Sequence, residues 1–464
     1  MGFIGRKSEL EILNKRQNKK KSHFFIIYGK RRMGKTELIK QFIKNKQGIY
    51  FLADKRTEIE QLKELSDIIA EHYGDSFVRS RGFSNWIEVF SYIKEKKKDK
   101  LIFAVDEYPY LIEANKTITS IFQKGWDEYL KDEGIFLILC GSSISIMESE
   151  ALIYKSPLYG RRTGQILLKP LSFQESSKFF PKKKFSDFLS IFTITGGIPA
   201  YLLQIEPDLS LRENIEKKIF SRTEFLHNEV EFILKEELRE PKNYFAILKA
   251  LSFGKTKFGE IANETGLTKN VLTKYLNTLE RLQLIEKEIP VTEKMPEKSR
   301  RGIYKISDNF FKFYFQFIYP NKSYIELENY SEVNRKLDES FNILESQCYE
   351  KICRELIIGF QDKLFNFERI GRWWEKDNEI DLLAISSKTK EILFGEVKWS
   401  SKQAGTNILE DLKLKAKLVD WNISNRKEYY ALFSKSGFTD SLIKQAKKEN
   451  VLLVHQDRML FKPD

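Results

Sequence analysis

A glycine-rich loop near the N-terminus constrains the fold of this chain more than any other feature. The loop follows an apolar run, residues 23–28, and leads into a helical pattern, residues 36–44, which is the strand–loop–helix context of a phosphate-binding loop. Its glycines let successive N–H groups turn toward a phosphate, and the N-terminus of the following helix adds partial positive charge. We therefore expect a parallel α/β domain in which Lys35 reaches the β- and γ-phosphates and Thr36 binds Mg²⁺. The unbroken GxxxxGK[ST] pattern consists of Gly29, Lys30, Arg31, Arg32, Met33, Gly34, Lys35 and Thr36.

A second apolar run, residues 101–105, ends in the acidic pair Asp106 and Glu107. Such a pair after a strand is often only a solvated turn, but downstream of a phosphate loop it indicates a hydrolytic site. We expect Asp106 to hold Mg²⁺ through water, and Glu107 to orient and deprotonate the attacking water. GTPases recognise guanine with Asn-Lys-x-Asp, and the segment Asn115-Lys116-Thr117-Ile118 does not fit this pattern. The sequence therefore predicts ATP and Mg²⁺ as ligands.

The composition excludes several other classes of protein. The 464 residues suffice for two to four domains, since a domain usually has about 100–200 residues. No apolar run approaches the roughly 18 residues of a membrane span, and the first residues show no signal-peptide pattern. Three cysteines without a CxxC pair predict neither a disulfide framework nor a thiolate zinc site. We expect a soluble, cytoplasmic protein without a membrane partner.

Changes of pattern along the chain divide it into four expected domains. Over residues 1–170, short apolar runs alternate with helical segments, which indicates a P-loop domain with a parallel sheet. Residues 171–240 have a helical pattern and are expected to form a helical lid. Residues 241–318 and 319–464 are expected to form a winged helix-turn-helix and a C-terminal α/β domain.

The winged helix-turn-helix is predicted from a short helix, a glycine-containing turn at Gly266 and a longer helix within residues 244–282. A hairpin with a basic loop, residues 292–301, follows as the wing. Residues 241–306 hold 13 Lys or Arg against 7 Asp or Glu, which favours duplex DNA as a partner. A winged helix that only packs against neighbouring domains is the alternative. The polar residues off the apolar stripe of the longer helix, which could face a major groove, are Thr268, Lys269, Asn270, Thr273, Lys274 and Asn277.

The C-terminal domain carries charges on two expected strands, residues 379–385 and 391–399. Residues two apart on a strand share a face, so Glu396 and Lys398 project together. If Asp381 lies opposite on the paired strand, two carboxylates and an ammonium meet at one place. Two carboxylates can hold Mg²⁺ while a lysine orients the nucleophile, which is the arrangement for metal-assisted phosphodiester hydrolysis. A solvated hairpin with alternating charges is the structural alternative.

Three N-terminal segments together resemble a known family. They are Phe3-Ile4-Gly5-Arg6 with Glu9-Leu10, Tyr28-Gly29-x-Arg31-Arg32-x-Gly34-Lys35-Thr36, and Asp106-Glu107-x-Pro109-Tyr110-Leu111. The family is that of the archaeal-type ATPases, which belong to the AAA-like and STAND-like P-loop ATPases. The resemblance implies an ATP-hydrolysing domain followed by a lid.

The same resemblance implies roles for four further residues. Ser142, at the end of a strand, would sense the γ-phosphate. Arg161 and Arg162 lie in a basic segment that would supply a γ-phosphate sensor or arginine finger, although they could equally form a salt-bridged surface pair. Pro199 of the Gly197-x-Pro199 motif would pack against adenine, unless the glycines act only as a helix C-cap and turn.

The C-terminal segment from Trp373 to Trp399 resembles the PD-(D/E)XK nuclease superfamily. It is similar to the nuclease-related domain that is fused to many archaeal-type ATPases. The resemblance implies a restriction-endonuclease-like α/β fold in which Asp381, Glu396 and Lys398 are catalytic. Glu345 falls where the superfamily has a helical acidic residue, and Glu350 and Glu355 lie on the same expected helix.

Two hypotheses about function follow. In the first, ATP hydrolysis rearranges lid, winged helix and nuclease-like domain and gates a metal-dependent cut in DNA. In the second, the chain is a STAND-like switch whose nucleotide state controls binding to DNA or protein partners without cleavage. Assembly into a homo-oligomer is compatible with both hypotheses.

Overall fold

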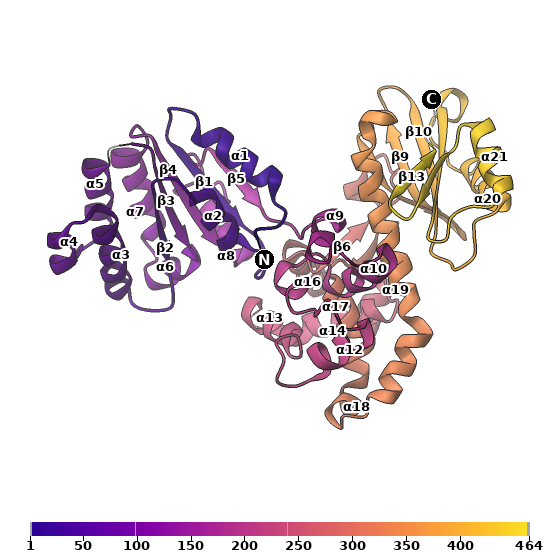
Figure 1. Cartoon of the computed structure of the whole chain (residues 1–464), viewed down its shortest axis with the longest axis horizontal. Coiled ribbons are helices and arrows are strands. Elements are labelled where there is room, and N and C mark those ends of the chain that lie inside the picture. Colours follow the sequence, from indigo (N-terminus) through magenta and orange to yellow (C-terminus); the bar gives the residue numbers. More distant parts are fainter. Residues whose placement is uncertain (1, 98, 239, 462–464) are drawn as a thin grey trace. The chain divides into compact units, whose positions relative to one another are not determined.

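The computed structural model describes residues 2–97, 99–238 and 240–461, and the chain forms two compact units (Figure 1). The first unit comprises Met1–Leu171 and Ile198–Tyr201, and the second comprises Ser172–Gly197 and Leu202–Asp464. The division into four domains stays a prediction. Among the described residues, no helix is both long and apolar enough to cross a membrane.

The first unit contains a five-stranded sheet in which every paired strand is parallel, with the order β2-β3-β4-β1-β5. The three central strands, β1, β3 and β4, are buried along their whole length, as expected of a parallel sheet covered on both faces. The predicted α/β domain with a parallel sheet is therefore confirmed. The strands are β1 (His23–Tyr28), β2 (Gly48–Leu52), β3 (Leu101–Asp106), β4 (Ile135–Gly141) and β5 (Gly164–Leu167).

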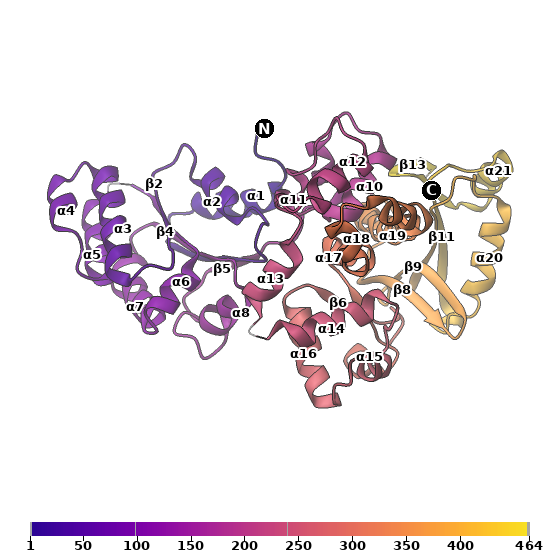
Figure 2. The ribbon, with the colours of Figure 1, turned by 90° about the horizontal axis from the view of Figure 1, so that it is seen from below.

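Helices cover both faces of this sheet, and Figure 2 shows α1 and α2 on one side and α6 and α7 on the other. On the first side, Phe42 of α2 packs against Phe136 of β4, with ring centroids 5.2 Å apart. On the other side, Phe90 of α5 packs edge-on against Phe122 of α7 at 5.1 Å. The helices are α1 (Lys7–Gln17), α2 (Lys35–Ile43), α3 (Glu58–Tyr73), α4 (Ser76–Arg81), α5 (Trp86–Lys96), α6 (Tyr108–Ala114), α7 (Ile118–Gly125) and α8 (Ile144–Ile146).

The second unit begins with helices and a two-stranded hairpin. The segment that predicts a helix-turn-helix forms α15 and α16, and Gly266 ends α15 in the left-handed conformation that glycine favours. Strands β6 and β7 follow as an antiparallel pair. The elements are α9 (Phe173–Ser176), α10 (Phe185–Thr195), α12 (Leu211–Ile215), α13 (Glu229–Glu237), α14 (Pro241–Ser252), α15 (Phe258–Thr265), α16 (Lys269–Arg281), β6 (Ile285–Glu288), β7 (Ile303–Ile306), α17 (Asn309–Phe313), α18 (Lys322–Glu326) and α19 (Tyr330–Gly359). Helix α11 (Pro199–Leu202) belongs mainly to the first unit, which includes Ile198–Tyr201.

A six-stranded sheet with the order β13-β12-β11-β10-β9-β8 completes the second unit. The expected strand pair forms, since β9 and β10 are antiparallel and Gly395 pairs with Leu382, which brings Asp381 close to Glu396. Apolar residues of α20 and α21, such as Leu412 and Leu442, form a buried core with Phe394. The elements are β8 (Arg369–Glu375), β9 (Asn378–Ser386), β10 (Glu391–Lys398), α20 (Thr406–Ala416), β11 (Lys427–Ser434), α21 (Asp440–Glu449), β12 (Leu452–His455) and β13 (Arg458–Phe461).

Candidate nucleotide site and C-terminal carboxylate site

The glycine-rich loop connects β1 to α2, as the sequence predicts, and its two glycines are required by its shape. Gly29 has φ 151°, and a Cβ atom there would lie 2.6 Å from the carbonyl oxygen of Leu168, which is too close for any side chain. Gly34 has φ 78° and is the N-cap of α2, so the loop turns directly into the helix N-terminus. The loop therefore presents the positive end of α2 at the end of a buried strand.

Lys35 is the first residue of α2, and its side chain folds back over the loop. Its ammonium donates hydrogen bonds to the carbonyl oxygens of Gly29 at 3.0 Å and Lys30 at 2.8 Å. The residue is only 5% exposed, and this burial lowers the pKa of Lys35. Charged phosphate oxygens bind an ammonium more strongly than carbonyl oxygens do. A bound phosphate would therefore replace these two carbonyl oxygens as the partner of Lys35.

Two elements distant in sequence support the loop. Arg6, from the N-terminal motif, is buried and donates to the carbonyl oxygen of Met33 at 3.0 Å, while an ion pair of 3.2 Å joins it to Glu9. Pro199 lies on the other side, since its Cγ would be 3.9 Å from a Cβ placed at Gly34. The structure thus places Pro199 of the Gly-x-Pro motif beside the phosphate loop. Lys30, Arg31 and Arg32 are partly exposed, and Met33 is fully buried.

Asp106 lies at the end of β3 and is oriented by three donors. Its Oδ2 accepts from the Thr36 hydroxyl at 2.6 Å and from the Tyr50 hydroxyl at 2.9 Å, and its Oδ1 accepts from the N–H of Glu107 at 2.9 Å. Asp106 is fully buried, and burial together with this carboxylate raises the pKa of Tyr50. A hydroxyl and a carboxylate that are this close are hard oxygen ligands that suit Mg²⁺ in the company of water and phosphate. The residues present therefore fit the metal that the sequence implies.

Tyr50 was not predicted from the sequence. It reaches Asp106 because β2 pairs with β3 in a register that places Tyr50 beside Ala104. A tyrosine in a strand is usually a packing residue, and strand order is not readable from one sequence, so only the structure identifies this contact.

Glu107 follows Asp106 in a left-handed conformation, φ 52°, at the N-cap of α6. Its Oε2 accepts hydrogen bonds from the Ser142 hydroxyl at 2.7 Å and from the Ser142 N–H at 3.3 Å. Ser142 follows β4 and is 2% exposed. The two residues predicted to act at the γ-phosphate, from separate strands, are therefore in direct contact.

Arg161 and Arg162 have protein partners of their own. The Arg161 guanidinium forms an ion pair of 3.1 Å with Asp127. Arg162 donates to the carbonyl oxygen of Leu152 at 2.9 Å and stacks over Tyr159, with its guanidinium carbon 4.8 Å from the ring centroid. Their role toward a nucleotide stays a prediction, and the surface-pair alternative accounts for the Arg161 contact.

The C-terminal carboxylates meet as the strand pairing predicts. Asp381 on β9 accepts a hydrogen bond of 2.9 Å from the N–H of Val397 on β10. Glu396 is 6% exposed, and Lys398 donates to its Oε1 at 2.7 Å. Lys415 of α20 lies 3.4 Å from both Glu396 oxygens and was missed from the sequence, because nothing places α20 against β10 beforehand.

The environment of Asp381 is that of a carboxyl group that resists ionisation. Burial, followed by the nearby carboxylates of Glu396 and Glu350, raises the pKa of Asp381 to about 7. The pKa of Lys398 is also raised. Burial lowers this pKa, but the hydrogen bond to Glu396 and the charge of that carboxylate raise it. Among residues 2–97, 99–238 and 240–461, no three His, Cys, Asp or Glu side chains are grouped so that they could hold a metal ion.

Among the three candidate carboxylates on α19, Glu350 is close enough to Asp381 that its charge contributes to the raised pKa of Asp381. Glu345 is instead bonded to other groups: its Oε2 accepts from the indole N–H of Trp399 at 3.0 Å, and Ser190 of α10 donates to its Oε1. Glu345 thus ties α10 and α19 to the residue after Lys398. A catalytic role of Glu345, which its place at the superfamily's helical acidic position implies, stays a prediction.

The expected wing, between β6 and β7, packs against the C-terminal sheet. The N–H of Val291 donates to the carbonyl oxygen of Arg372 on β8 at 3.0 Å, and Val291 belongs to the same buried core as Trp373. Arg301 donates to the carbonyl oxygen of Trp374 and forms an ion pair of 3.2 Å with Glu293. The polar residues of α16 that the sequence places off its apolar stripe are exposed: Thr268, Lys269, Asn270, Thr273, Lys274 and Asn277.

Comparison with known proteins agrees with the N-terminal geometry. Residues 3–205 match a sequence family described as an ATPase domain predominantly from Archaea, which confirms the expected resemblance to archaeal-type ATPases. Residues 314–408 match a family described as Archaea bacterial proteins of unknown function. The resemblance to nucleases stays a prediction.

Individual relatives give the same picture. An uncharacterized protein of Methanocaldococcus jannaschii is 37% identical over 438 residues, which are 93% of this chain and 95% of the relative. An uncharacterized ATP-binding protein of the same organism is 51% identical over 45 residues, 10% of this chain and 76% of that protein. Among solved structures, the Walker-type ATPase of Pyrococcus abyssi is 21% identical with a TM-score of 0.48, over 68% of this chain and 96% of that one. The chain therefore belongs to the family of the Methanocaldococcus jannaschii protein that it matches over most of its length, and its residues 3–205 are an ATPase domain of the predominantly archaeal type.

Proposed function

We propose that this protein binds ATP with Mg²⁺ at the β1–α2 loop and hydrolyses it to drive its action on DNA. The observation that carries the proposal is the contact of 2.6 Å between the Thr36 hydroxyl and Asp106, beside the buried ammonium of Lys35. A relative whose name describes an ATP-binding protein supports the choice of nucleotide. Mg²⁺, when bound, neutralises charge on the phosphates and orients them for attack.

Each residue of the site has a task in this reaction. Lys35 exchanges the carbonyl oxygens of Gly29 and Lys30 for the β- and γ-phosphates, and the N-terminal N–H groups of α2 bind the phosphate oxygens. Thr36 and Asp106 hold the metal, the latter through water. Pro199 bounds the adenine side of the loop, and Ser142 is the sensor of the γ-phosphate. Arg161 or Arg162 would stabilise charge on the transferred phosphate if the ATPase cycle releases them from their present partners.

Glu107 is the base that takes the proton from the attacking water. In the structure its Oε2 is occupied by two donors from Ser142. When Ser142 turns to a γ-phosphate instead, the Glu107 carboxylate is free to bind and deprotonate the attacking water. Sensing of the nucleotide and activation of water are thereby linked through one contact.

Nucleotide binding tests the first part of the proposal. Lys35→Ala should abolish binding of a fluorescent ATP analogue while Arg16→Ala, a cation of the same unit outside the loop, should not. ATP should compete with the analogue better than GTP. Equal binding by the Lys35 variant would contradict the assigned site.

Duplex DNA is the proposed macromolecular partner, with α16 as the contacting helix. Its exposed Lys269 and Lys274 lie on a face rich in hydroxyl and amide side chains, which suits phosphate and base-edge contacts. The wing contributes less than the sequence suggests, because Arg301 is bonded to Trp374 and Glu293.

A second candidate activity is metal-dependent cleavage of DNA in the C-terminal domain. The specific observation is that Asp381 accepts from the N–H of Val397 and so lies beside the buried Glu396, where a divalent cation would relieve the repulsion of two neighbouring carboxylates. Asp381 and Glu396 would hold the metal, and Lys398 would stabilise charge on the scissile phosphate. Incubation with plasmid DNA, Mg²⁺ or Mn²⁺ and ATP tests this, with Asp381→Ala and Lys398→Ala as variants. If no form of DNA is cut, the nucleotide-controlled switch without cleavage is the better account.

A further inference from the structure

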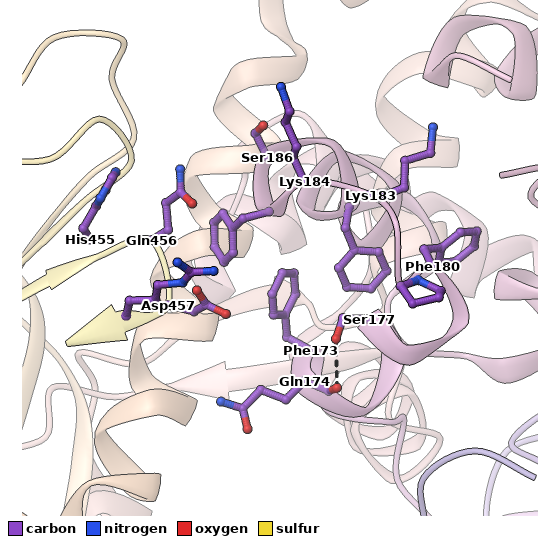
Figure 3. Close-up of a pocket in the computed structure, with 14 residues that line it drawn as sticks. Phe173, Gln174, Ser177, Phe180, Lys183, Lys184, Ser186, His455, Gln456 and Asp457 are labelled. Carbon is purple, nitrogen blue, oxygen red and sulfur yellow. Dashed lines mark hydrogen bonds between the residues drawn. The ribbon is translucent and has the colours of Figure 1, made fainter. Parts of the chain in front are cut away.

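A cavity of about 530 Å³ lies within the second unit, apart from both sites described above. It is bounded by α9, the segment that follows it and the start of α10 on one side, and by the turn between β12 and β13 on the other. Figure 3 shows Phe173 in its wall, with His455, Gln456 and Asp457 across from it. Its volume is that of pockets that hold ligands of nucleotide size, roughly 300–1,000 Å³.

Aromatic rings form one wall of the cavity. Phe173 and Phe188 are buried, whereas Phe185 is partly exposed and packs against Phe173 with ring centroids 5.2 Å apart. The Phe185 ring is also 6.0 Å from Tyr349 and 6.5 Å from Trp399. A partly exposed ring that is fixed by three others is a rigid platform on which a planar base can stack.

Positive charge surrounds the same cavity. Lys183, Lys184 and Arg458 line it together with one acidic residue, Asp457. In Figure 3 the ammonium groups of Lys183 and Lys184 point to the same side, away from Phe173. Lys184 is also the N-cap of the 11-residue α10 and makes no side-chain bond to its first turn, whereas the Lys183 ammonium donates to the carbonyl oxygen of Leu209 at 3.3 Å. An aromatic wall with cations at its rim matches a base joined to a phosphate.

Beyond the cavity, the Phe185 ring contacts a residue close to the C-terminal carboxylates. Trp399, which touches Phe185, directly follows Lys398, and the ammonium of Lys435 lies 4.2 Å from the centre of the Trp399 ring. A polyanion seated in the cavity would therefore find a further aromatic ring and a further cation along its path. These neighbouring rings and cations favour a strand of nucleic acid over a free nucleotide. A duplex does not fit the chemistry, because its bases are already stacked on one another.

We propose that this cavity binds an unpaired nucleotide of a single-stranded nucleic acid, with its base on Phe185 and its phosphates near Lys184 and Arg458. The site is separate from the ATP site and from α16. It gives the protein a way to distinguish a frayed or opened strand from intact duplex.

The test is fluorescence anisotropy of a labelled single-stranded oligothymidylate with the full chain. The double variant Lys184→Glu, Arg458→Glu should weaken binding by about tenfold or more, since it reverses two charges near the backbone. Lys178→Glu reverses one charge on the segment between α9 and α10, outside the cavity, and should change the affinity less than about twofold. An unchanged affinity in the double variant overturns the proposal.

Two further arms separate the base from the phosphate and the strand from a free nucleotide. Phe185→Leu keeps an apolar side chain and should weaken single-strand binding roughly fivefold or more, with a melting curve close to the parent's; equal affinity would refute stacking. Thymidine monophosphate should compete far less well than the oligonucleotide, and competition at equal nucleotide concentration would assign the cavity to a small molecule. ATP hydrolysis and duplex binding should persist in these variants, so failure here is distinguishable from failure of the proposed function.

Discussion

Removal of the Tyr50 hydroxyl tests whether the orientation of Asp106 matters for the metal. Tyr50→Phe deletes one of two hydroxyl donors to Asp106 Oδ2 and leaves the Thr36 contact in place. A hydrogen bond to a charged group contributes about 1.5–3 kcal/mol. Because Tyr50 is partly exposed and Thr36 remains, we use the lower end, about 1.5 kcal/mol, which corresponds to about a tenfold change in an equilibrium constant.

This loss should fall on the metal rather than on the nucleotide. Titration calorimetry of ATP binding, with Mg²⁺ and with EDTA, separates the two contributions. We expect the gain in ATP affinity from Mg²⁺ to shrink by up to about tenfold in Tyr50→Phe, with little change of affinity in EDTA. Tyr92→Phe is the matched control, because its hydroxyl donates to Asp75 at 2.8 Å elsewhere in the same unit. An equal loss in EDTA, or the same loss in the control, would refute the reasoning.

Three further predictions concern the second unit. The pKa of Asp381 is about 7 in the folded protein, so the folded protein holds this proton more tightly than the unfolded chain does. The contribution of Asp381 to the free energy of unfolding should therefore fall as pH rises from about 4 to about 7, by at most about 4 kcal/mol. Asp381→Asn should therefore raise the melting temperature at pH 8 more than at pH 5, and an equal effect at both pH values would contradict the assignment. On α16, Lys269→Ala with Lys274→Ala should weaken duplex binding and reduce the salt slope by about two. Arg301→Ala should leave duplex affinity unchanged but lower the melting temperature, because it removes the contacts of Arg301 with Trp374 and Glu293. A weaker binding isotherm with an unchanged melting curve would show instead that the wing binds DNA.

Local pattern predicts much of the ATPase domain. The loop that contains Gly29 and Gly34 is specified by residues adjacent in sequence, since its glycines, the buried strand before it and the helix after it all act within a short segment. Asp106 and Glu107 can be predicted in the same way, because one short segment contains both the hydrophobic strand and the acidic residues that end it. The contact between Thr36 and Asp106 then follows from placing β1 and β3 in one parallel sheet.

The missing parts depend on pairing between distant segments. Tyr50 reaches Asp106 only because β2 lies beside β3, and Lys415 reaches Glu396 only because α20 covers β10. The same is true of Arg301, whose charge suggested DNA but whose guanidinium contacts β8. Charge and amphipathicity predict which residues lie outside the core. They do not predict which neighbouring segment those residues contact.

The role of Glu107 as the base is tested by measuring ATP turnover and ATP binding of Glu107→Gln in the same preparation. We expect this variant to bind ATP with Mg²⁺ as well as the parent does but to hydrolyse it at least about a hundredfold more slowly, because an amide cannot accept the proton of the attacking water. Lys35→Ala should lose binding and turnover together. Parent-like turnover by Glu107→Gln would contradict the central claim that Glu107, held by Ser142 in the structure, is the base of an ATPase.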